Sequence, residues 1–112
     1  NEKGELQIRS SEDFEARVLG AKQPVLVDFY SSTCGPCRML VPTIENLAEQ
    51  YEGRAAVYKV NVETLPEVAR RYGIQGVPSV LFFQDGKEVN RLVGLRPQDA
   101  YSVVLDRLLN SV

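Results

Sequence analysis

The chain has no histidine and no tryptophan, and only two of its 112 residues are cysteines. A structural zinc site takes four nitrogen or sulfur ligands, usually two cysteine pairs or one pair with histidines, and this composition supplies two. A framework of several disulfides, as in small secreted domains, is excluded by the same count. The chemistry that remains belongs to one cysteine pair, Cys34 and Cys37.

Long hydrophobic runs and an excess of basic charge are also missing. No apolar run approaches the roughly 20 residues that a membrane-spanning helix needs, and the net charge is −2. We therefore expect neither a membrane nor a nucleic acid as partner. With 44% apolar residues and no linker or repeat, residues 1–112 are expected to form one domain. Residues 1–4 begin without methionine and are expected to be disordered or an artificial extension.

Apolar periodicity alternates between strand-like and helix-like segments along the chain. It predicts strands at residues 24–31, 55–62, 78–84 and 87–93, and a short edge strand at 6–8. It predicts helices at about residues 11–19, 35–51, 64–72 and 97–112. This order indicates an α/β fold, a central mixed sheet of about five strands flanked by about four helices.

Polar residues and prolines mark where these helices begin and bend. Ser10 or Ser11 is expected to cap the first helix, and Thr64 with Glu67 to form a capping box for the third. Pro42 is expected to kink the second helix rather than end it, because the apolar period continues past it.

The cysteine pair reads Cys34-Gly35-Pro36-Cys37 and follows the apolar strand at 24–31. Three interpretations are open: reversible dithiol chemistry, a static bridge, or an inert pair. A static bridge would close a very short loop, and the chain-entropy model gives it roughly 2 kcal/mol. A domain of this size and apolar content has little need of that stabilisation, so the pattern favours reversible dithiol chemistry.

A family resemblance covers about residues 5–110. It is carried by five signals in chain order: Asp28, Cys34-Gly35-Pro36-Cys37, Pro42, Gly76-Val77-Pro78-Ser79 and Val93-Gly94. In this set the sequence resembles the thioredoxin family, and Gly-Pro between the cysteines sets it apart from glutaredoxins and disulfide isomerases. The resemblance implies a thioredoxin fold and a protein-disulfide oxidoreductase without cofactor or metal. It also implies disulfide-bearing target proteins and a thioredoxin reductase or similar electron donor as partners.

The two cysteines are expected to play different roles, with Cys34 as the attacking nucleophile and Cys37 as the resolving thiol. A thiolate forms more easily at a helix N-terminus, where unpaired N–H groups and the helix dipole favour an anion. A lowered thiol pKa is already known for thioredoxins, so it is not an independent prediction. Cys37 lies one helical turn further on, close enough to bond with Cys34 yet more buried. Gly35 and Pro36 have two compatible interpretations: they start the helix, and they stiffen the turn and help to set the dithiol–disulfide balance.

Asp28 interrupts the most apolar strand, where burial would resist its ionisation. It is either a partly exposed residue at a strand end or a buried acid beneath Cys37 that passes a proton as that thiol reacts. The thioredoxin pattern favours the second interpretation. Lys59 occupies the family's lysine position on the neighbouring strand, where it would support the charge of Asp28 or extend outward from an apolar strand.

A small apolar patch around the cysteines is expected to receive target proteins. Pro78 matches the family's cis-proline, although only about 5–6% of X–Pro bonds are cis. A proline there leaves the backbone polar groups of Val77 available to an extended target peptide. The predicted patch consists of Thr33, Gly35, Pro36, Val77, Pro78, Val93, Gly94 and Leu95. Taken singly, Val77 and Val93 are more often core residues, so the patch depends on the fold.

The sequence departs from the thioredoxin pattern just before the cysteines. Thioredoxins usually have tryptophan immediately before the first cysteine and another a few residues earlier, where this chain has Thr33 and Tyr30. The change puts partner choice, recognition by a conventional thioredoxin reductase and the redox potential in question. It removes no group that the exchange chemistry requires, and Arg38 keeps the positive charge of the lysine more common at its position.

These features predict a monomeric protein-disulfide reductase of a reducing compartment, the cytoplasm. Two alternatives stay open. One is an oxidant or isomerase in an exported setting, which a measured redox potential would separate. The other is a thioredoxin-like binding module whose cysteines do not turn over; Cys34, Cys37, Asp28 and Pro78 together argue against it.

Overall fold

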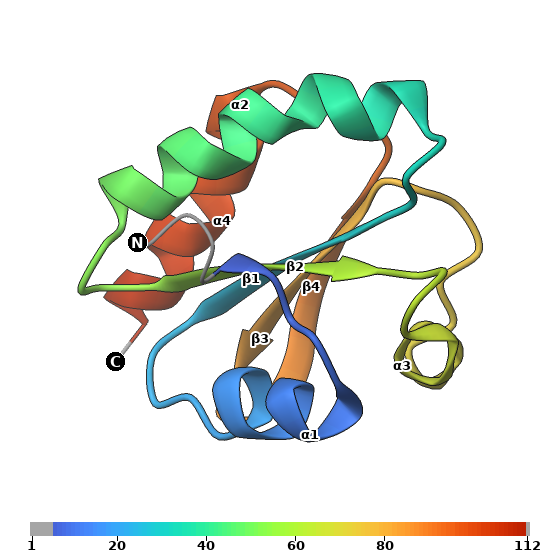
Figure 1. The fold of residues 1–112 in the computed structure, drawn as a ribbon. Helices are drawn as coiled ribbons and strands as arrows, with labels where there is room; N and C mark the ends of the chain where they lie inside the picture. Colours follow the sequence, from blue (N-terminus) through green and yellow to red (C-terminus); the bar gives the residue numbers. More distant parts are fainter. Residues whose placement is uncertain (1–5, 112) are drawn as a thin grey trace.

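The computed structural model describes residues 6–111, which form a central sheet covered by helices on both faces (Figure 1). The strands are β1 (Val25–Tyr30), β2 (Ala56–Asn61), β3 (Ser79–Gln84) and β4 (Lys87–Val93), in the order β2-β1-β3-β4. β1 runs parallel to β2 and antiparallel to β3, and β3 is antiparallel to β4. The predicted α/β fold with a mixed sheet is confirmed. The prediction for residues 1–4 lies outside the described part of the chain.

The sheet of residues 6–111 has four strands rather than about five. The predicted edge strand at 6–8 forms only an isolated bridge, between Gln7 and Lys59. There the Ile8 N–H donates to the Lys59 carbonyl at 2.9 Å. No ladder develops because the chain passes at once into the helix cap at Ser10.

The first predicted helix divides into α1 (Ser11–Phe14) and a π-helical segment, η2 (Glu15–Leu19). Ser10 provides the cap, since its hydroxyl accepts a hydrogen bond from the Asp13 N–H at 3.0 Å. The π-helical segment closes where the Gly20 N–H donates to the carbonyl five residues back, at 2.9 Å.

α2 (Gly35–Gln50) starts immediately after the loop that follows β1. Its buried residues, Cys37, Leu40, Ile44 and Leu47, recur every three or four positions and form one stripe. Pro42 lies inside the helix and does not end it, as predicted. The kink at that position stays a prediction.

α3 (Pro66–Arg71) begins without the predicted capping box, and that prediction is wrong. Its N-cap residue is Leu65, which makes no side-chain cap. The Thr64 hydroxyl donates to the Asn61 carbonyl at 3.3 Å, and the Glu67 carboxylate accepts from an α1 hydroxyl at 2.9 Å. Both side chains therefore have other partners, and proline at the first helical position starts the helix without needing a cap.

α4 (Gln98–Asn110) follows Pro97, which is its N-cap. The predicted apolar face is confirmed for Tyr101, Val104 and Leu105, which are buried, while Val112 lies outside the described residues. None of the helices within residues 6–111 combines the length and apolar character that crossing a bilayer requires.

Two apolar cores lie on opposite faces of the sheet, one under α2 and α4 and the other under α1, η2 and α3 (Figure 1). The α2/α4 core includes Leu26, Leu40, Ile44, Leu47, Tyr51, Val80, Phe82, Tyr101 and Leu105. The α1/α3 core includes Ile8, Phe14, Val18, Val25, Val27, Phe29, Val60, Leu81 and Phe83. Side chains alternate along a strand, so Asp28 of β1 faces α2 and α4, like Leu26 two residues before it.

Candidate active site

The two cysteines lie at the N-terminus of α2, a few residues after the C-terminal end of β1. Cys34 is the N-cap of the helix and Cys37 belongs to its first turn. They form a disulfide, with their Cα atoms 5.2 Å apart, well within the range that a bridge requires. Cys34 is half-buried, whereas Cys37 is 3% exposed. Cys34 is therefore the sulfur that a large partner reaches more easily.

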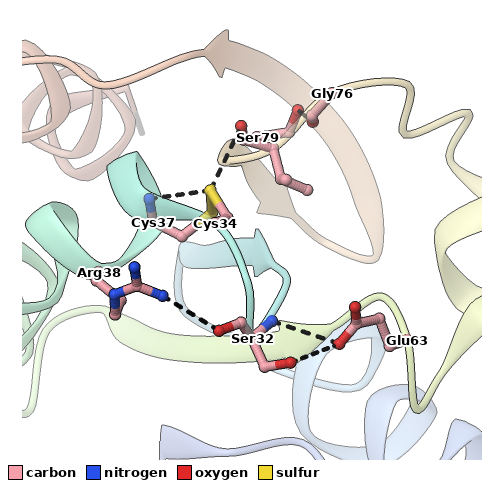
Figure 2. The surroundings of a disulfide bond; sticks show 8 residues. Ser32, Cys34, Cys37, Arg38, Glu63, Gly76 and Ser79 are labelled. Atoms are coloured by element: carbon pink, nitrogen blue, oxygen red, sulfur yellow. Dashed lines mark hydrogen bonds between the residues drawn. A yellow bond between two sulfur atoms is a disulfide. The ribbon is translucent and has the colours of Figure 1, made fainter.

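The surroundings of the Cys34 sulfur favour negative charge. The Cys37 N–H donates to Cys34 Sγ at 3.1 Å (Figure 2), whereas the Val77 carbonyl oxygen, 3.8 Å from the same sulfur, opposes a negative charge there. The N–H groups at this helix end and the dipole behind them stabilise an anion at the cap. Cys34 is thus placed where a thiolate would gain most, once the bridge is reduced.

Asp28 is buried beneath the cysteines and is only 1% exposed. Neither carboxylate oxygen has a hydrogen-bond partner among residues 6–111. Burial raises the pKa of Asp28 to about 7, and the positive charge of Lys59 opposes this increase. The interpretation of Asp28 as a partly exposed strand-end residue is excluded. The carboxyl group instead titrates close to neutral pH.

Lys59 stands opposite Asp28 in the register of β1 and β2. Its Nζ lies 4.9 Å from the centre of the Tyr30 ring, a distance typical of a cation–π contact. The side chain is half-buried. The lysine thus acts on Asp28 through its charge while its ammonium group rests on Tyr30, so it combines features of both predicted interpretations.

A cavity of about 90 Å³ connects the buried acid with the buried thiol. Its lining residues are Asp28, Tyr30, Ser31, Ser32, Cys37, Arg38, Val41 and Lys59. The fold therefore brings Asp28, Cys37 and Lys59, three of the predicted site residues, to the wall of one cavity. A proton exchanged between the carboxyl and the thiol would not need to cross the apolar core.

The predicted docking residues come from three separate segments: the turn into α2, the loop before β3, and the end of β4 with the loop that follows it. The Val77–Pro78 peptide bond is cis, and within residues 6–111 the Val77 N–H makes no hydrogen bond. Pro78 is buried, and its carbonyl accepts from the Gly94 N–H at 2.8 Å. Val93 and Leu95 are 51% and 42% exposed, so they are surface residues rather than core. Thr33 and Pro36 are exposed, and Gly35 and Val77 half-buried.

Sequence reasoning missed a hydrogen-bonded clamp on the loop before Cys34. The Ser32 hydroxyl and N–H both donate to Glu63, at 2.7 and 3.4 Å (Figure 2). The Arg38 guanidinium donates to the Ser32 carbonyl at 3.3 Å, and the Glu63 N–H donates to Asn61 Oδ1 at 2.8 Å. Ser32 and Glu63 lie 31 residues apart, so no local pattern would have revealed their contact.

Met39 is a second residue that the sequence did not single out, and it is 68% exposed on the first turns of α2. This large apolar side chain is exposed two residues after Cys37 in the sequence. A signal was present, since Met39 is apolar but lies outside the buried stripe of α2.

Comparison with known proteins points in one direction. The family named Thioredoxin matches residues 5–107 of the chain. "Thioredoxin 1" of Nostoc sp. is 43% identical over 96 residues, covering 86% of this chain and 90% of that protein. "Thioredoxin M-type, chloroplastic" of Pisum sativum is 37% identical over 105 residues, covering 94% of this chain. The chain spans only 61% of the length of that pea protein.

A solved structure agrees with the sequence comparisons. A mutant thioredoxin from Halobacterium salinarum superposes with a TM-score of 0.86 at 36% identity, covering 96% of this chain and 92% of that one. Fold, cysteine geometry and family match therefore coincide over nearly the whole chain, and the chain belongs to the thioredoxin family.

Proposed function

We propose that this chain is a protein-disulfide oxidoreductase that reduces disulfide bonds of target proteins through Cys34 and Cys37. The observation that carries the proposal is the position of Cys34: a half-buried sulfur at the N-terminus of α2, held by the Cys37 N–H at 3.1 Å and within bonding reach of a second cysteine. Thiol–disulfide exchange needs a reachable thiolate and a nearby resolving thiol, and this corner of the fold offers both.

The reaction takes place in two exchanges. The Cys34 thiolate attacks one sulfur of the target disulfide, the target S–S bond breaks, and the other target sulfur leaves as a thiolate. Cys37 then loses its proton and attacks Cys34 Sγ, which releases the second target sulfur as a thiolate. The target disulfide gains two electrons and, with two protons, becomes a dithiol. The chain gives up those two electrons and ends with a Cys34–Cys37 bridge.

Asp28 would accept the proton of Cys37 during the second exchange. Its carboxyl shares the 90 Å³ cavity with Cys37, and burial raises its pKa to about 7, where a general base works best at neutral pH. Lys59 would stabilise the carboxylate as it forms, since its charge opposes the increase in pKa. In this role Lys59 supports Asp28 and does not touch the reacting sulfurs.

The target would bind across the patch formed by Thr33, Gly35, Pro36, Val77, Pro78, Val93, Gly94 and Leu95. The Val77 carbonyl lies 3.8 Å from Cys34 Sγ, so an extended peptide that pairs with the Val77 backbone would carry its own sulfur to Cys34. The exposed apolar side chains of Val93 and Leu95 would contact the residues flanking the target cysteine.

The chain would act mainly as a reductant in a reducing compartment such as the cytoplasm, as a monomer. Its only two cysteines form the exchanging pair, which suits such a compartment better than a disulfide-rich secreted scaffold would. Thioredoxins are reduced by thioredoxin reductase or ferredoxin–thioredoxin reductase. Thr33, in place of the family's usual tryptophan, would influence which of these donors recognises this chain.

Insulin reduction tests the proposal, run once with dithiothreitol and once with NADPH and a thioredoxin reductase. We expect insulin precipitation to accelerate with both donors. Acceleration with dithiothreitol alone would keep the exchange chemistry and point to a different physiological donor. No acceleration with either would overturn the proposed function.

A further inference from the structure

Tyr101 is a buried tyrosine directly beneath the segment Val93–Arg96, here named the docking loop. The residue lies in the first turn of α4 and its side chain is 0% exposed. A phenol buried to this extent needs hydrogen-bond partners for its hydroxyl. Both of its partners are in the docking loop, which begins at the last residue of β4, leads toward α4 and carries part of the proposed target surface.

The Tyr101 hydroxyl accepts a hydrogen bond from the Arg96 N–H at 3.2 Å and donates to the Gly94 carbonyl at 3.4 Å. It thus joins two positions of the docking loop to the helix below. Burial raises the pKa of Tyr101 above its ordinary value, and the charge of Asp28 adds to the increase. The phenol therefore stays protonated and remains a donor at neutral pH.

The same loop is connected on its other side to the segment that faces Cys34. The Gly94 N–H donates to the Pro78 carbonyl at 2.8 Å, and Gly94 has a φ of +90°, a region that favours glycine. Gly94 therefore links Tyr101 to the loop whose Val77 carbonyl contacts Cys34 Sγ. Movement of the docking loop would separate the two halves of the target surface.

We propose that Tyr101 is a positioning residue for target recognition, which holds the docking loop in the conformation that protein targets bind. The inference rests on the proposed disulfide reductase function and extends it to a residue buried beneath the surface. A loop that is ordered before binding loses less conformational entropy when a target docks. A small disulfide that touches only Cys34 gains nothing from this order.

The chain contains a matched control, Tyr51. It is also buried, 1% exposed, and its hydroxyl donates to Asp106 Oδ1 at 2.6 Å and lies 3.3 Å from the Ser102 carbonyl. These contacts join the C-terminal end of α2 to α4, at the opposite end of α2 from the cysteines. Tyr51→Phe therefore removes a buried hydroxyl of the same kind without touching the docking loop.

The test compares pre-reduced wild type, Tyr101→Phe and Tyr51→Phe in stopped flow against insulin and against 2-hydroxyethyl disulfide. We expect the second-order rate constant of Tyr101→Phe toward insulin to fall about two- to tenfold, the range of one hydrogen bond. Its rate constant toward 2-hydroxyethyl disulfide should stay at the wild-type value. Tyr51→Phe should match the wild type on both substrates even if it melts at a lower temperature.

A second measurement reports directly on the loop. Amide hydrogen exchange at Arg96 should accelerate in Tyr101→Phe and not in Tyr51→Phe. An equal loss on both disulfides, the same loss in Tyr51→Phe, or unchanged Arg96 exchange would each overturn the inference. A wild-type protein that reduces neither disulfide would instead overturn the proposed function, so the two failures are distinguishable.

Discussion

The two faces of the sheet are covered by similar aliphatic and aromatic side chains, but the buried polar group on one face is hydrogen-bonded and that on the other is not. Among residues 6–111, one carboxyl and one aliphatic hydroxyl are buried, those of Asp28 and Ser79. Asp28 pairs with Val80 of the α2/α4 core, whereas Ser79 pairs with Phe29 of the α1/α3 core. Each face therefore holds one such group, and the two can be compared directly.

The buried Ser79 hydroxyl has a hydrogen-bond partner, because it donates to the Gly76 carbonyl at 2.6 Å. Asp28 has no hydrogen-bond partner among the described residues, and its pKa is raised to about 7. Buried polar groups are nearly always paired in folded proteins. The satisfied hydroxyl shapes a turn, while the unsatisfied carboxyl opposes stability and lies in one cavity with a cysteine, as expected for a group retained for its chemistry.

The largest effect is expected from a change at Cys34, the N-cap residue of α2. Cys34→Ser should reduce insulin reduction to the uncatalysed rate, because a serine hydroxyl is not ionised at neutral pH and cannot replace the thiolate. Insulin turbidity with dithiothreitol measures the loss. Activity that persists would show that Cys34 is not the nucleophile.

Cys37→Ser should also block turnover, but with a different product. Cys34 would still attack the target, and the mixed disulfide would remain because no resolving thiol follows. We expect a covalent adduct between this variant and insulin or another disulfide protein on a non-reducing gel, released by dithiothreitol. Failure to capture any disulfide-bearing protein would refute the resolving role.

The pH dependence of stability should distinguish Asp28 from Ser79. The carboxyl of Asp28 has a folded-state pKa of about 7, above the value of 3.8 for an unperturbed aspartate. The folded state therefore binds the extra proton between these values, and stability falls as pH rises through that window. The loss is about 4 kcal/mol by pH 8, at about 1.4 kcal/mol per pKa unit.

Asp28→Asn tests this prediction, because the amide stays neutral and nearly equal in size. Urea unfolding of the oxidised proteins at pH 4, 6 and 8 should show similar free energies at pH 4. The variant should then become progressively more stable than the wild type as pH rises. Parallel pH curves for the two proteins would mean that Asp28 titrates normally and is not the proton acceptor proposed here.

Ser79→Ala should have a smaller effect, independent of pH. The change removes the hydrogen bond to the Gly76 carbonyl, which corresponds to about 1–2 kcal/mol of unfolding free energy. No ionisable group is involved, so the difference from wild type should be the same at pH 4 and pH 8 in urea unfolding. A pH-dependent difference would mean that the two faces are electrostatically coupled.

The smallest effect is expected on the outer surface of the α1/α3 face. Arg71 and Glu15 form an ion pair at 2.9 Å, with about half of each side chain exposed. Such pairs contribute less than about 1 kcal/mol and are weakened by salt. Arg71→Ala should therefore shift the unfolding midpoint only slightly, and the shift should disappear at high concentrations of NaCl. A larger, salt-independent loss would indicate that Arg71 packs as well as pairs.

Much of the fold could be predicted because helices and strands depend on local periodicity. The four longest predicted strands and the continuation of α2 through Pro42 correspond to the observed elements. The errors occur where a residue far away in the sequence is the hydrogen-bond partner of a side chain predicted to bond locally, or where the chain turns before a strand can extend. Glu67 closes no capping box on α3, because its carboxylate accepts instead from the Ser11 hydroxyl, 56 residues away, and residues 6–8 form one bridge instead of a strand.

Sequence patterns pointed to Asp28, Cys34, Cys37 and Pro78 as candidate site residues, but not to the contacts that connect the site with the rest of the chain. Tyr101 could be placed in the core from helical spacing, yet nothing in that spacing indicated that its hydroxyl holds the docking loop. The Glu63 clamp on Ser32 was equally invisible. Both contacts join segments whose approach depends on how α4 and the loop after β2 pack against the rest of the domain.

The amino-acid sequence by itself determined which segments are helical or extended and that two cysteines stand one helical turn apart at the start of a helix, since both follow from interactions within a few residues. Only the tertiary structure decided that Asp28 is desolvated, that it shares a cavity with Cys37, and that Val77 meets Cys34 across 43 positions of chain. The physical reason is that desolvation and long-range contact are properties of the packed sheet and helices together, and no single segment carries them.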